Sequence, residues 1–185
     1  MNKLIVLITC FLCLVGPAKV AESNGKGVRI PFYILNAASQ FNIDADLMYA
    51  LCRVESNCNP KAVNHSDGTP AQKAAGMIVK SYGLFQIQLS TAEDLGFISK
   101  ETLEIDRIRH HKIIKVKKTI DHTKELLNPA TNSYYAAMLL AHLYHRYGDT
   151  ERVISAYNAG RYIKSNKDYV YKVLLNYTRN KIDRR

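Results

Sequence analysis

The sequence contains few of the residues that mark non-globular chains. Of its 185 residues, only 9 are glycine, 5 are proline and 4 are cysteine. The low glycine and proline content excludes a collagen-like or low-complexity chain, and four cysteines are too few for a disulfide-rich scaffold. No apolar run reaches the roughly 20 residues that a membrane-spanning helix needs. With 47% apolar and 23% charged residues, the composition is globular, and the chain is too short for two ordinary domains.

Acidic residues are also scarce relative to basic ones. There are 26 Lys and Arg against 16 Asp and Glu, which gives a formal net charge of +10. A partner with negative charge is therefore expected, and nucleic acid is one candidate. The clearest basic cluster is either a solvated face or a phosphate-binding patch, and it consists of His110, His111, Lys112, Lys115, Lys117 and Lys118. No nucleic-acid reading motif accompanies this cluster, which argues against nucleic acid as the partner.

Residues 1–21 predict an export signal. Lys3 provides the positive start, residues 4–15 form an uncharged, mostly apolar run of 12, and small residues follow at Gly16, Ala18 and Ala21. The alternative is an uncleaved anchor or a buried N-terminal helix. Cleavage is expected after Ala18 or Ala21. Cleavage after Ala21 leaves a chain of net charge +8, in which residues 22–30 form a short linker. We therefore expect an exported protein with no stable membrane span after cleavage.

Cys52 and Cys58 are the two cysteines that the exported chain retains. A continuous helix would hold their Cα atoms roughly 9 Å apart, which is beyond disulfide reach, so bonding requires the helix to end between them. Export permits disulfides. The sequence leaves two interpretations open, a Cys52–Cys58 disulfide or two buried free thiols.

Start and stop signals predict about six or seven helices and little sheet. Residues 64–80 look loop-like, residues 81–89 suggest a short strand, and residues 99–126 show no clear period. The predicted helices span residues 31–40, 45–55 with Asp44 as N-cap, 90–96 after a capping box at 90–93, 129–148 after Asn128, 150–160 after Asp149 or Thr150, and a last one from Ser165. We expect one domain over 31–180, a candidate insertion over 99–126, and a basic tail over 181–185.

Glu55 is expected at the end of the second helix. Ser56-Asn57-Cys58-Asn59-Pro60 directly follows it, and this run is rich in turn formers and ends in proline. By itself this position is typical of a solvated glutamate, for example one paired with Arg53. A helix C-terminus disfavours the anionic form of a carboxyl group.

Four segments together resemble the SLT-type lytic transglycosylases of the lysozyme superfamily. In chain order they are Glu55-Ser56 with Asn59-Pro60, Gly83-Leu84-Phe85-Gln86-Ile87, the helix after Asn128, and Ala156-Tyr157-Asn158-Ala159-Gly160. The likeness covers roughly residues 31–179 and is interrupted at 99–126. It implies a mainly α, lysozyme-like fold with a substrate cleft and at most a small irregular sheet.

The resemblance also implies roles for individual residues. Glu55 matches the catalytic acid/base and Ser56 the serine that lines the site. Gln86 matches the glutamine facing the cleft, although it could instead satisfy a buried backbone group. Tyr157 matches the tyrosine whose hydroxyl lies near the catalytic carboxyl, with Asn158 beside it. This chain departs from the family pattern at Phe85, where Met is frequent, at Cys58, where an aromatic residue is common, and in a longer 61–80 loop.

The resemblance implies cleavage of peptidoglycan glycan strands to 1,6-anhydro ends without water, in the periplasm or cell envelope. One carboxyl suits this reaction, because hydrolysing glycosidases add a second. Asp67, Glu93 and Asp94 are candidates for a second acid only by proximity in sequence. No cofactor is expected, and no metal, because His142 and His145 lack a third ligand at usual spacing. The small size resembles transglycosylases that serve secretion, conjugation or pilus machines. The alternatives are a lysozyme-like muramidase and a non-catalytic wall- or nucleic-acid-binding protein.

Overall fold

The computed structural model describes residues 28–109 and 112–183. The predicted export signal, most of the predicted linker and the last two residues of the predicted basic tail lie outside the described residues. None of the described helices is both long enough and apolar enough to cross a bilayer.

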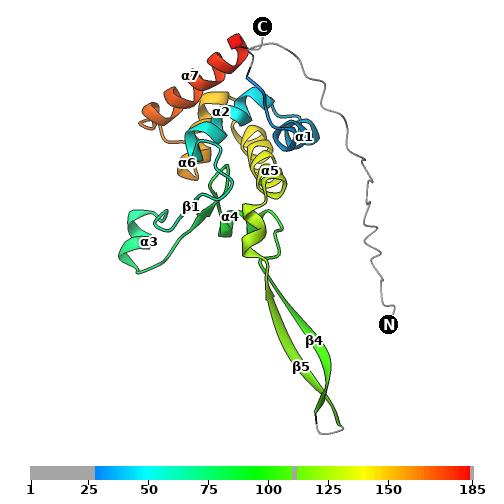
Figure 1. Ribbon diagram of the computed structural model, residues 1–185. Coiled ribbons are helices and arrows are strands. Elements are labelled where there is room, and N and C mark those ends of the chain that lie inside the picture. Colours follow the sequence, from blue (N-terminus) through cyan, green and yellow to red (C-terminus); the bar gives the residue numbers. More distant parts are fainter. Residues whose placement is uncertain (1–27, 110–111, 184–185) are drawn as a thin grey trace, which may run out of the picture.

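The described chain is mainly helical, as the sequence predicts. Five longer helices form one body, with the short α3 and α4 and a 3-10 helix beside it (Figure 1). The longer helices are α1 (Phe32–Gln40), α2 (Ala45–Ser56), α5 (Pro129–Tyr147), α6 (Thr150–Ala159) and α7 (Lys167–Asp183). The shorter ones are α3 (Pro70–Ala74), α4 (Leu89–Asp94) and the 3-10 helix η1 (Thr123–Leu127).

Side-chain caps fix the ends of these helices close to the predicted positions. The Asp44 carboxylate accepts from the Asp46 N–H at 2.8 Å, and the Asn128 side chain accepts from the Ala130 N–H at 2.9 Å. Asp149 caps α6 in the same way, accepting from the Arg152 N–H at 2.9 Å. A left-handed glycine, Gly148, ends α5. These caps satisfy N–H groups that the first helical turn leaves unpaired.

Two predicted helix starts are wrong. The expected capping box at 90–93 does not cap α4, which begins at Leu89 with Gln88 as its N-cap residue. Strand β3 leads straight into this helix and buries Ile87, so strand pairing sets where α4 begins. The last helix begins at Lys167 instead of Ser165, because a turn closed by Asn166 N–H to the Ile163 carbonyl at 3.0 Å precedes it.

A small antiparallel sheet joins the helical body. Its strands are β1 (Val63–Asn64), β2 (Ser81–Tyr82) and β3 (Ile87–Gln88), in the order β1-β2-β3. The predicted extended segment is therefore two strands of two residues each, separated by a turn at 83–86. Helix α3 lies within the stretch expected to be loop.

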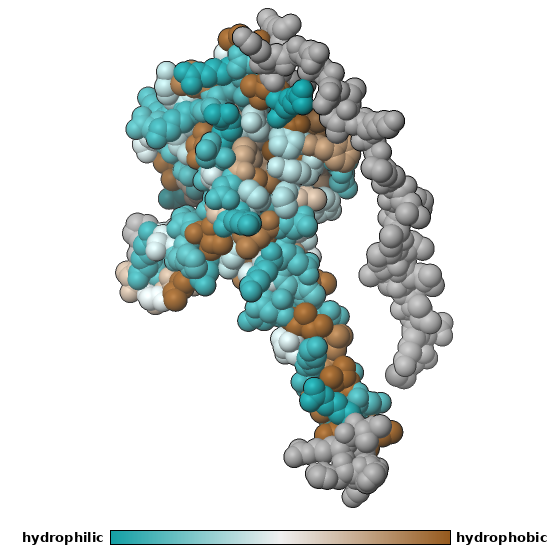
Figure 2. Space-filling view, in the orientation of Figure 1, coloured by the Kyte–Doolittle hydropathy of each residue, from teal (hydrophilic) through white to brown (hydrophobic). Residues whose placement is uncertain are grey.

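Residues 100–121 form a long hairpin that the sequence analysis did not predict. Strands β4 (Lys100–Arg109) and β5 (Lys112–Asp121) pair antiparallel over their whole length, and the hairpin projects away from the helical body (Figure 1). The space-filling view shows hydrophobic side chains exposed along the hairpin (Figure 2).

One core runs through the helical body and carries the site at its edge. Its largest fully buried side chains come from most of the helices and from the 84–87 segment: Ile34, Leu47, Met48, Leu51, Leu84, Phe85, Ile87, Leu126, Leu140, Val153, Ile154 and Val173. The end of α7 is held to the start of α2, because Asp44 accepts from the Tyr177 hydroxyl at 2.7 Å and pairs with Lys181 at 3.0 Å. Residues 181–183 of the predicted tail therefore extend α7.

Candidate active site

The end of α2 is shaped by two consecutive residues in the left-handed conformation. Asn57 has φ 53° and Cys58 has φ 56°, so the chain reverses and the Cys58 N–H donates to the Cys52 carbonyl at 3.0 Å. The structure joins Cys52 and Cys58 in a disulfide with a Cα separation of 4.9 Å. Helix α2 ends at Ser56, between the two cysteines, so Glu55 lies in its last turn. The disulfide ties this last turn to the residues that follow it.

The 83–86 turn depends on a glycine at position 83. Gly83 has φ +73°, and a Cβ atom there would lie 2.7 Å from Asn132 Nδ2 and 2.9 Å from the Leu126 carbonyl oxygen. Any larger residue would therefore clash with backbone as well as adopt an unfavourable φ.

Asn132, fully buried on α5, holds this turn in place. Its Oδ1 accepts from the Phe85 N–H at 2.8 Å, and its Nδ2 donates to the carbonyls of Tyr82 at 2.8 Å and Leu126 at 2.9 Å. Buried polar groups need such partners, so these three bonds fix the turn relative to α5 and η1.

A pocket of about 140 Å³ lies between α2, the 83–88 segment, α6 and the 64–67 loop. Four of the five predicted site residues line it: Glu55, Gln86, Tyr157 and Asn158. The other lining residues are Asn64, Asp67, Ile87, Gln88, Thr91 and Leu139. The structure thus brings together residues from segments that the sequence separates by about a hundred positions.

Ser56, the fifth predicted residue, is not among the residues that line this pocket. Its hydroxyl donates to the Leu84 carbonyl at 2.7 Å and accepts from the Asn59 N–H at 3.0 Å. It therefore links the end of α2 to the 83–86 turn, which positions Glu55 relative to Gln86.

Gln86 both faces the pocket and satisfies backbone groups, the two roles that the sequence left open. It lines the pocket, and its Nε2 also donates to the backbone carbonyls of Gly83 at 2.9 Å and Ala62 at 3.4 Å. Its φ of 48° is unusual for a residue other than glycine. These bonds keep the side chain fixed at the pocket wall.

Tyr157 lines the pocket, but its hydroxyl donates to the Phe85 carbonyl at 2.9 Å. Burial and the nearby Glu55 charge raise the pKa of Tyr157, so it remains a neutral donor. The hydroxyl bonded to Glu55 belongs to Tyr169 on α7, which donates to Glu55 Oε1. The sequence motifs do not identify Tyr169. The signal for its inward position is its spacing of four residues before Val173, which is buried in the last helix.

Glu55 is an acid whose pKa lies near neutral pH, so about half of it holds its proton at pH 7. Burial raises its pKa to about 7, and the negative charge of Asp67 also raises it, while the Tyr169 hydrogen bond lowers it. Among the ion pairs of the described residues there is none between Glu55 and Arg53, which is exposed. A proton donor for glycosidic-bond cleavage needs this kind of environment.

Asp67 is the second carboxylate of the pocket, and neither Glu93 nor Asp94 lines it. Its side chain accepts from the Ser81 hydroxyl and from Gln88 Nε2 at 3.1 Å. Asn64 Nδ2 is 3.4 Å from its other oxygen. Asp67 is therefore held by side chains of β1, β2 and β3.

The part of the chain that the structure describes contains no group of three or more His, Cys, Asp or Glu side chains that could hold a metal ion. One ring nitrogen of His142 lies 2.9 Å from the Met138 carbonyl of the preceding turn.

The helical body with its small sheet, and the acid in the last turn of α2 beside a pocket, are consistent with the lysozyme-like class of folds. Within that class the chain belongs to the family described as Transglycosylase SLT domain, whose sequence profile matches residues 32–174.

Similar proteins come from two genera of enteric bacteria. "Invasion protein IagB" of Salmonella typhimurium is 26% identical over 151 residues, which is 80% of this chain and 76% of that protein. "Protein IpgF" of Shigella flexneri is 25% identical over 171 residues, which is 91% of this chain and 83% of that protein. No solved structure matches the chain.

Proposed function

We propose that this protein is a peptidoglycan lytic transglycosylase that cleaves the β-1,4 bond between N-acetylmuramic acid and N-acetylglucosamine without consuming water. The observation that carries this proposal is the position of Glu55 at the wall of a polar pocket, where burial raises its pKa to about 7. Membership of the transglycosylase SLT family supports it independently.

In the first step Glu55 acts as the acid. Its carboxyl proton moves to the bridging oxygen, the bond from that oxygen to C1 of the muramic acid breaks, and the bonding electron pair leaves with the glucosamine hydroxyl. Positive charge develops at C1 and Glu55 becomes a carboxylate. Tyr169 stabilises that carboxylate by donating to Oε1, and the charge of Asp67 across the pocket favours the developing cation.

In the second step the same carboxylate acts as the base. It takes the proton of the muramic acid C6 hydroxyl, whose oxygen forms a bond to C1 and closes the 1,6-anhydro ring. Glu55 regains its proton, so the enzyme returns to its starting state and no water is used. The amides of Asn64, Gln86 and Asn158 line the same pocket and suit the hydroxyl and acetamido groups of the sugars.

Hydrolysis is the second candidate, and Asp67 is the observation that favours it. Most glycosidases that use water pair the acid with a second carboxylate, and Asp67 is a carboxylate in the same pocket as Glu55. The products separate the two reactions, because hydrolysis adds a water of about 18 Da and leaves a reducing end.

Digestion of purified sacculi tests the proposal. The exported chain should release muropeptides with anhydro ends, detected by mass spectrometry. Glu55→Gln should lower the release at least about 100-fold while the circular dichroism spectrum is unchanged. Glu151→Gln, which removes an exposed glutamate on α6, is the matched control and should retain activity. Products heavier by one water identify a hydrolase, and binding to sacculi with no release identifies a non-catalytic wall-binding protein.

We propose further that the chain is exported to the periplasm or cell envelope, where residues 31–180 act as the transglycosylase domain. There it would open the wall locally for an envelope-spanning machine, such as a secretion, conjugation or pilus apparatus. The small size of the chain and its similarity to a protein named for invasion support this role. Fractionation of cells, together with the mass of the exported chain, tests this proposal. An uncleaved chain that stays in the cytoplasm would contradict it.

A further inference from the structure

The β4–β5 hairpin has no role in the candidate active site, and none of its residues lines that pocket. Within the described part of the chain, its extensive contacts are those between its own two strands. Each strand is 10 residues long, so the hairpin is about 30 Å long. A two-stranded hairpin is marginally stable alone in water, which suggests that something covers it.

Its register separates the side chains into two different faces. Directly opposed residues share a face, and faces alternate along a strand. The aliphatic face consists of Glu101, Leu103, Ile105 and Arg107 on β4, opposite Ile120, Lys118, Val116 and Ile114 on β5. The polar face consists of Lys100, Thr102, Glu104 and Asp106, opposite Asp121, Thr119, Lys117 and Lys115, and it ends distally in the Ile108–Ile113 pair.

The aliphatic face is partly open to solvent, and Ile113 at the distal end of the polar face is 73% exposed. Leu103 and Ile114, which flank its centre, are 38% and 37% exposed. Hydrophobic side chains are visible along the hairpin in the space-filling view (Figure 2).

The two faces also differ in net charge. On the polar face, three cations oppose three anions in direct cross-strand pairs: Lys100 with Asp121, Glu104 with Lys117, and Asp106 with Lys115. The aliphatic face carries two cations, Arg107 and Lys118, and one anion, Glu101, which lies at the end nearest the body. The net positive charge of the hairpin therefore accompanies its apolar surface.

We propose that the aliphatic face of this hairpin docks the protein on an anionic membrane surface. Aliphatic side chains enter the boundary between headgroups and acyl chains, while Arg107 and Lys118 extend along that surface and meet lipid phosphates. A polyanion such as nucleic acid would satisfy the cations and leave the aliphatic residues uncovered. A second copy would place two faces of net positive charge against each other.

The residue types of the aliphatic face favour a bilayer over a protein partner. Its members are Leu, Ile, Val, Lys, Arg and one Glu, with no aromatic ring and no hydroxyl or amide side chain. Protein interfaces concentrate aromatic anchors and directional hydrogen bonds, whereas a bilayer requires neither.

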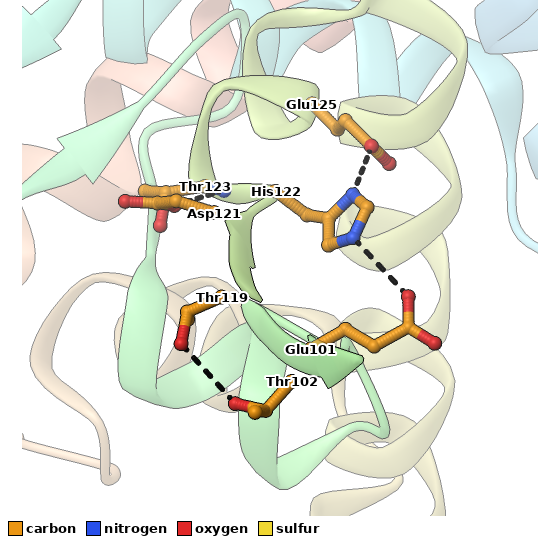
Figure 3. A network of polar contacts seen from close by, with 7 residues as sticks. All are labelled: Glu101, Thr102, Thr119, Asp121, His122, Thr123 and Glu125. Atoms are coloured by element: carbon orange, nitrogen blue, oxygen red, sulfur yellow. Dashed lines mark hydrogen bonds and ion pairs between the residues drawn. The ribbon is translucent and has the colours of Figure 1, made fainter. Parts of the chain in front are cut away.

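The base of the hairpin is joined to the helical body by polar contacts. His122 lies between Glu125 of η1, at 2.6 Å, and Glu101 of β4, at 3.7 Å (Figure 3). The Asp121 carboxylate accepts from the Thr123 N–H at 2.8 Å, which joins β5 to η1. Since the Leu126 carbonyl of η1 accepts from Asn132, the hairpin base and the 83–86 turn of the pocket share one buried anchor.

The chain has no tryptophan, so a single introduced indole reports on one face at a time. In the exported chain, residues 22–185, Ile114→Trp should shift its emission to shorter wavelength when vesicles containing phosphatidylglycerol are added. Lys117→Trp, on the polar face, is the matched control and should shift little. Equal shifts from both faces, or no shift from Ile114→Trp at about 50 mM salt, would overturn the proposal.

Vesicle sedimentation supplies a second measurement. Binding should require phosphatidylglycerol, weaken at about 500 mM salt, and fall at least about tenfold in Arg107→Gln/Lys118→Gln. Lys115→Gln/Lys117→Gln removes the same charge from the polar face and should weaken binding several-fold less. Leu103→Thr/Ile114→Thr replaces two aliphatic residues by threonine, which suits a strand, and should abolish binding. No sedimentation with anionic vesicles, together with a dimer that Leu103→Thr/Ile114→Thr dissociates, would instead identify a second copy as the occupant.

Discussion

The hydroxyl of Tyr169 donates a hydrogen bond to the carboxyl group of Glu55, across 114 positions of sequence. Burial and the Glu55 charge raise the pKa of Tyr169 far above its ordinary value, so the phenol acts only as a donor. This bond opposes the effect of burial on Glu55, because it favours the carboxylate that the second proton transfer requires.

Tyr169→Phe should therefore raise the pKa of Glu55 above about 7. The alkaline limb of the kcat/KM profile on sacculi should move up by about one pH unit, and the rate at its plateau should fall several-fold. Tyr171→Phe is the matched control, since Tyr171 lies on the same helix and is 66% exposed. An unchanged limb in Tyr169→Phe would show that the bond does not act on the titrating carboxyl.

Asp67→Asn should move the same limb in the opposite direction. The negative charge of Asp67 raises the pKa of Glu55, so its removal should lower that pKa and shift the limb to lower pH. Asp94→Asn, an exposed aspartate outside the pocket, serves as the control. If Asp67 is instead the base of a hydrolase, the variant should lose release of the heavier, hydrated products altogether.

The helical body was accessible from the sequence because its signals are local. Asp44, Asn128 and Asp149 cap helices within three residues of themselves, and Gly148 ends α5. The residues that resemble family motifs also came together, since Glu55, Gln86, Tyr157 and Asn158 line one pocket.

What the sequence did not reveal depends on distant pairing. Nothing near Tyr169 indicates Glu55, because α7 meets α2 only through the packing of the whole body. Apolar residues alternate with polar ones at Leu103 and Ile105 and at Ile114 and Val116. The charged residues Arg107 and Lys118 interrupt this alternation at the next positions. The sequence at 110–111 is His-His, without the Asn-Gly or Asp-Gly that marks a tight hairpin turn.

The Cys52–Cys58 disulfide should add to stability in the exported protein. It closes a loop with a sequence separation of 6, for which chain entropy predicts a contribution of about 2 kcal/mol. Intact mass without reductant should be about 2 Da lower than after reduction, since the bond removes two hydrogens. Reductant should also lower the urea midpoint of unfolding. An intact mass that reduction does not change would instead identify two free thiols.

Glu55 should make the protein less stable as the pH rises. Its pKa is about 7 in the folded chain against an ordinary 4.5, so the folded state holds the proton more tightly than the unfolded state does. Stability from this group is therefore complete below pH 4.5, falls between the two values, and is lost above about 7.

Glu55→Gln removes this dependence, because an amide does not titrate. Between about pH 4 and pH 8 the free energy of unfolding of the unmodified protein should fall by about 3 kcal/mol relative to the variant. Urea unfolding of both proteins across this range measures the difference, with Glu151→Gln as a control that should track the unmodified protein. Parallel curves for Glu55→Gln and the unmodified protein would mean that Glu55 is solvated in solution, and the acid that the proposed reaction needs would then be missing.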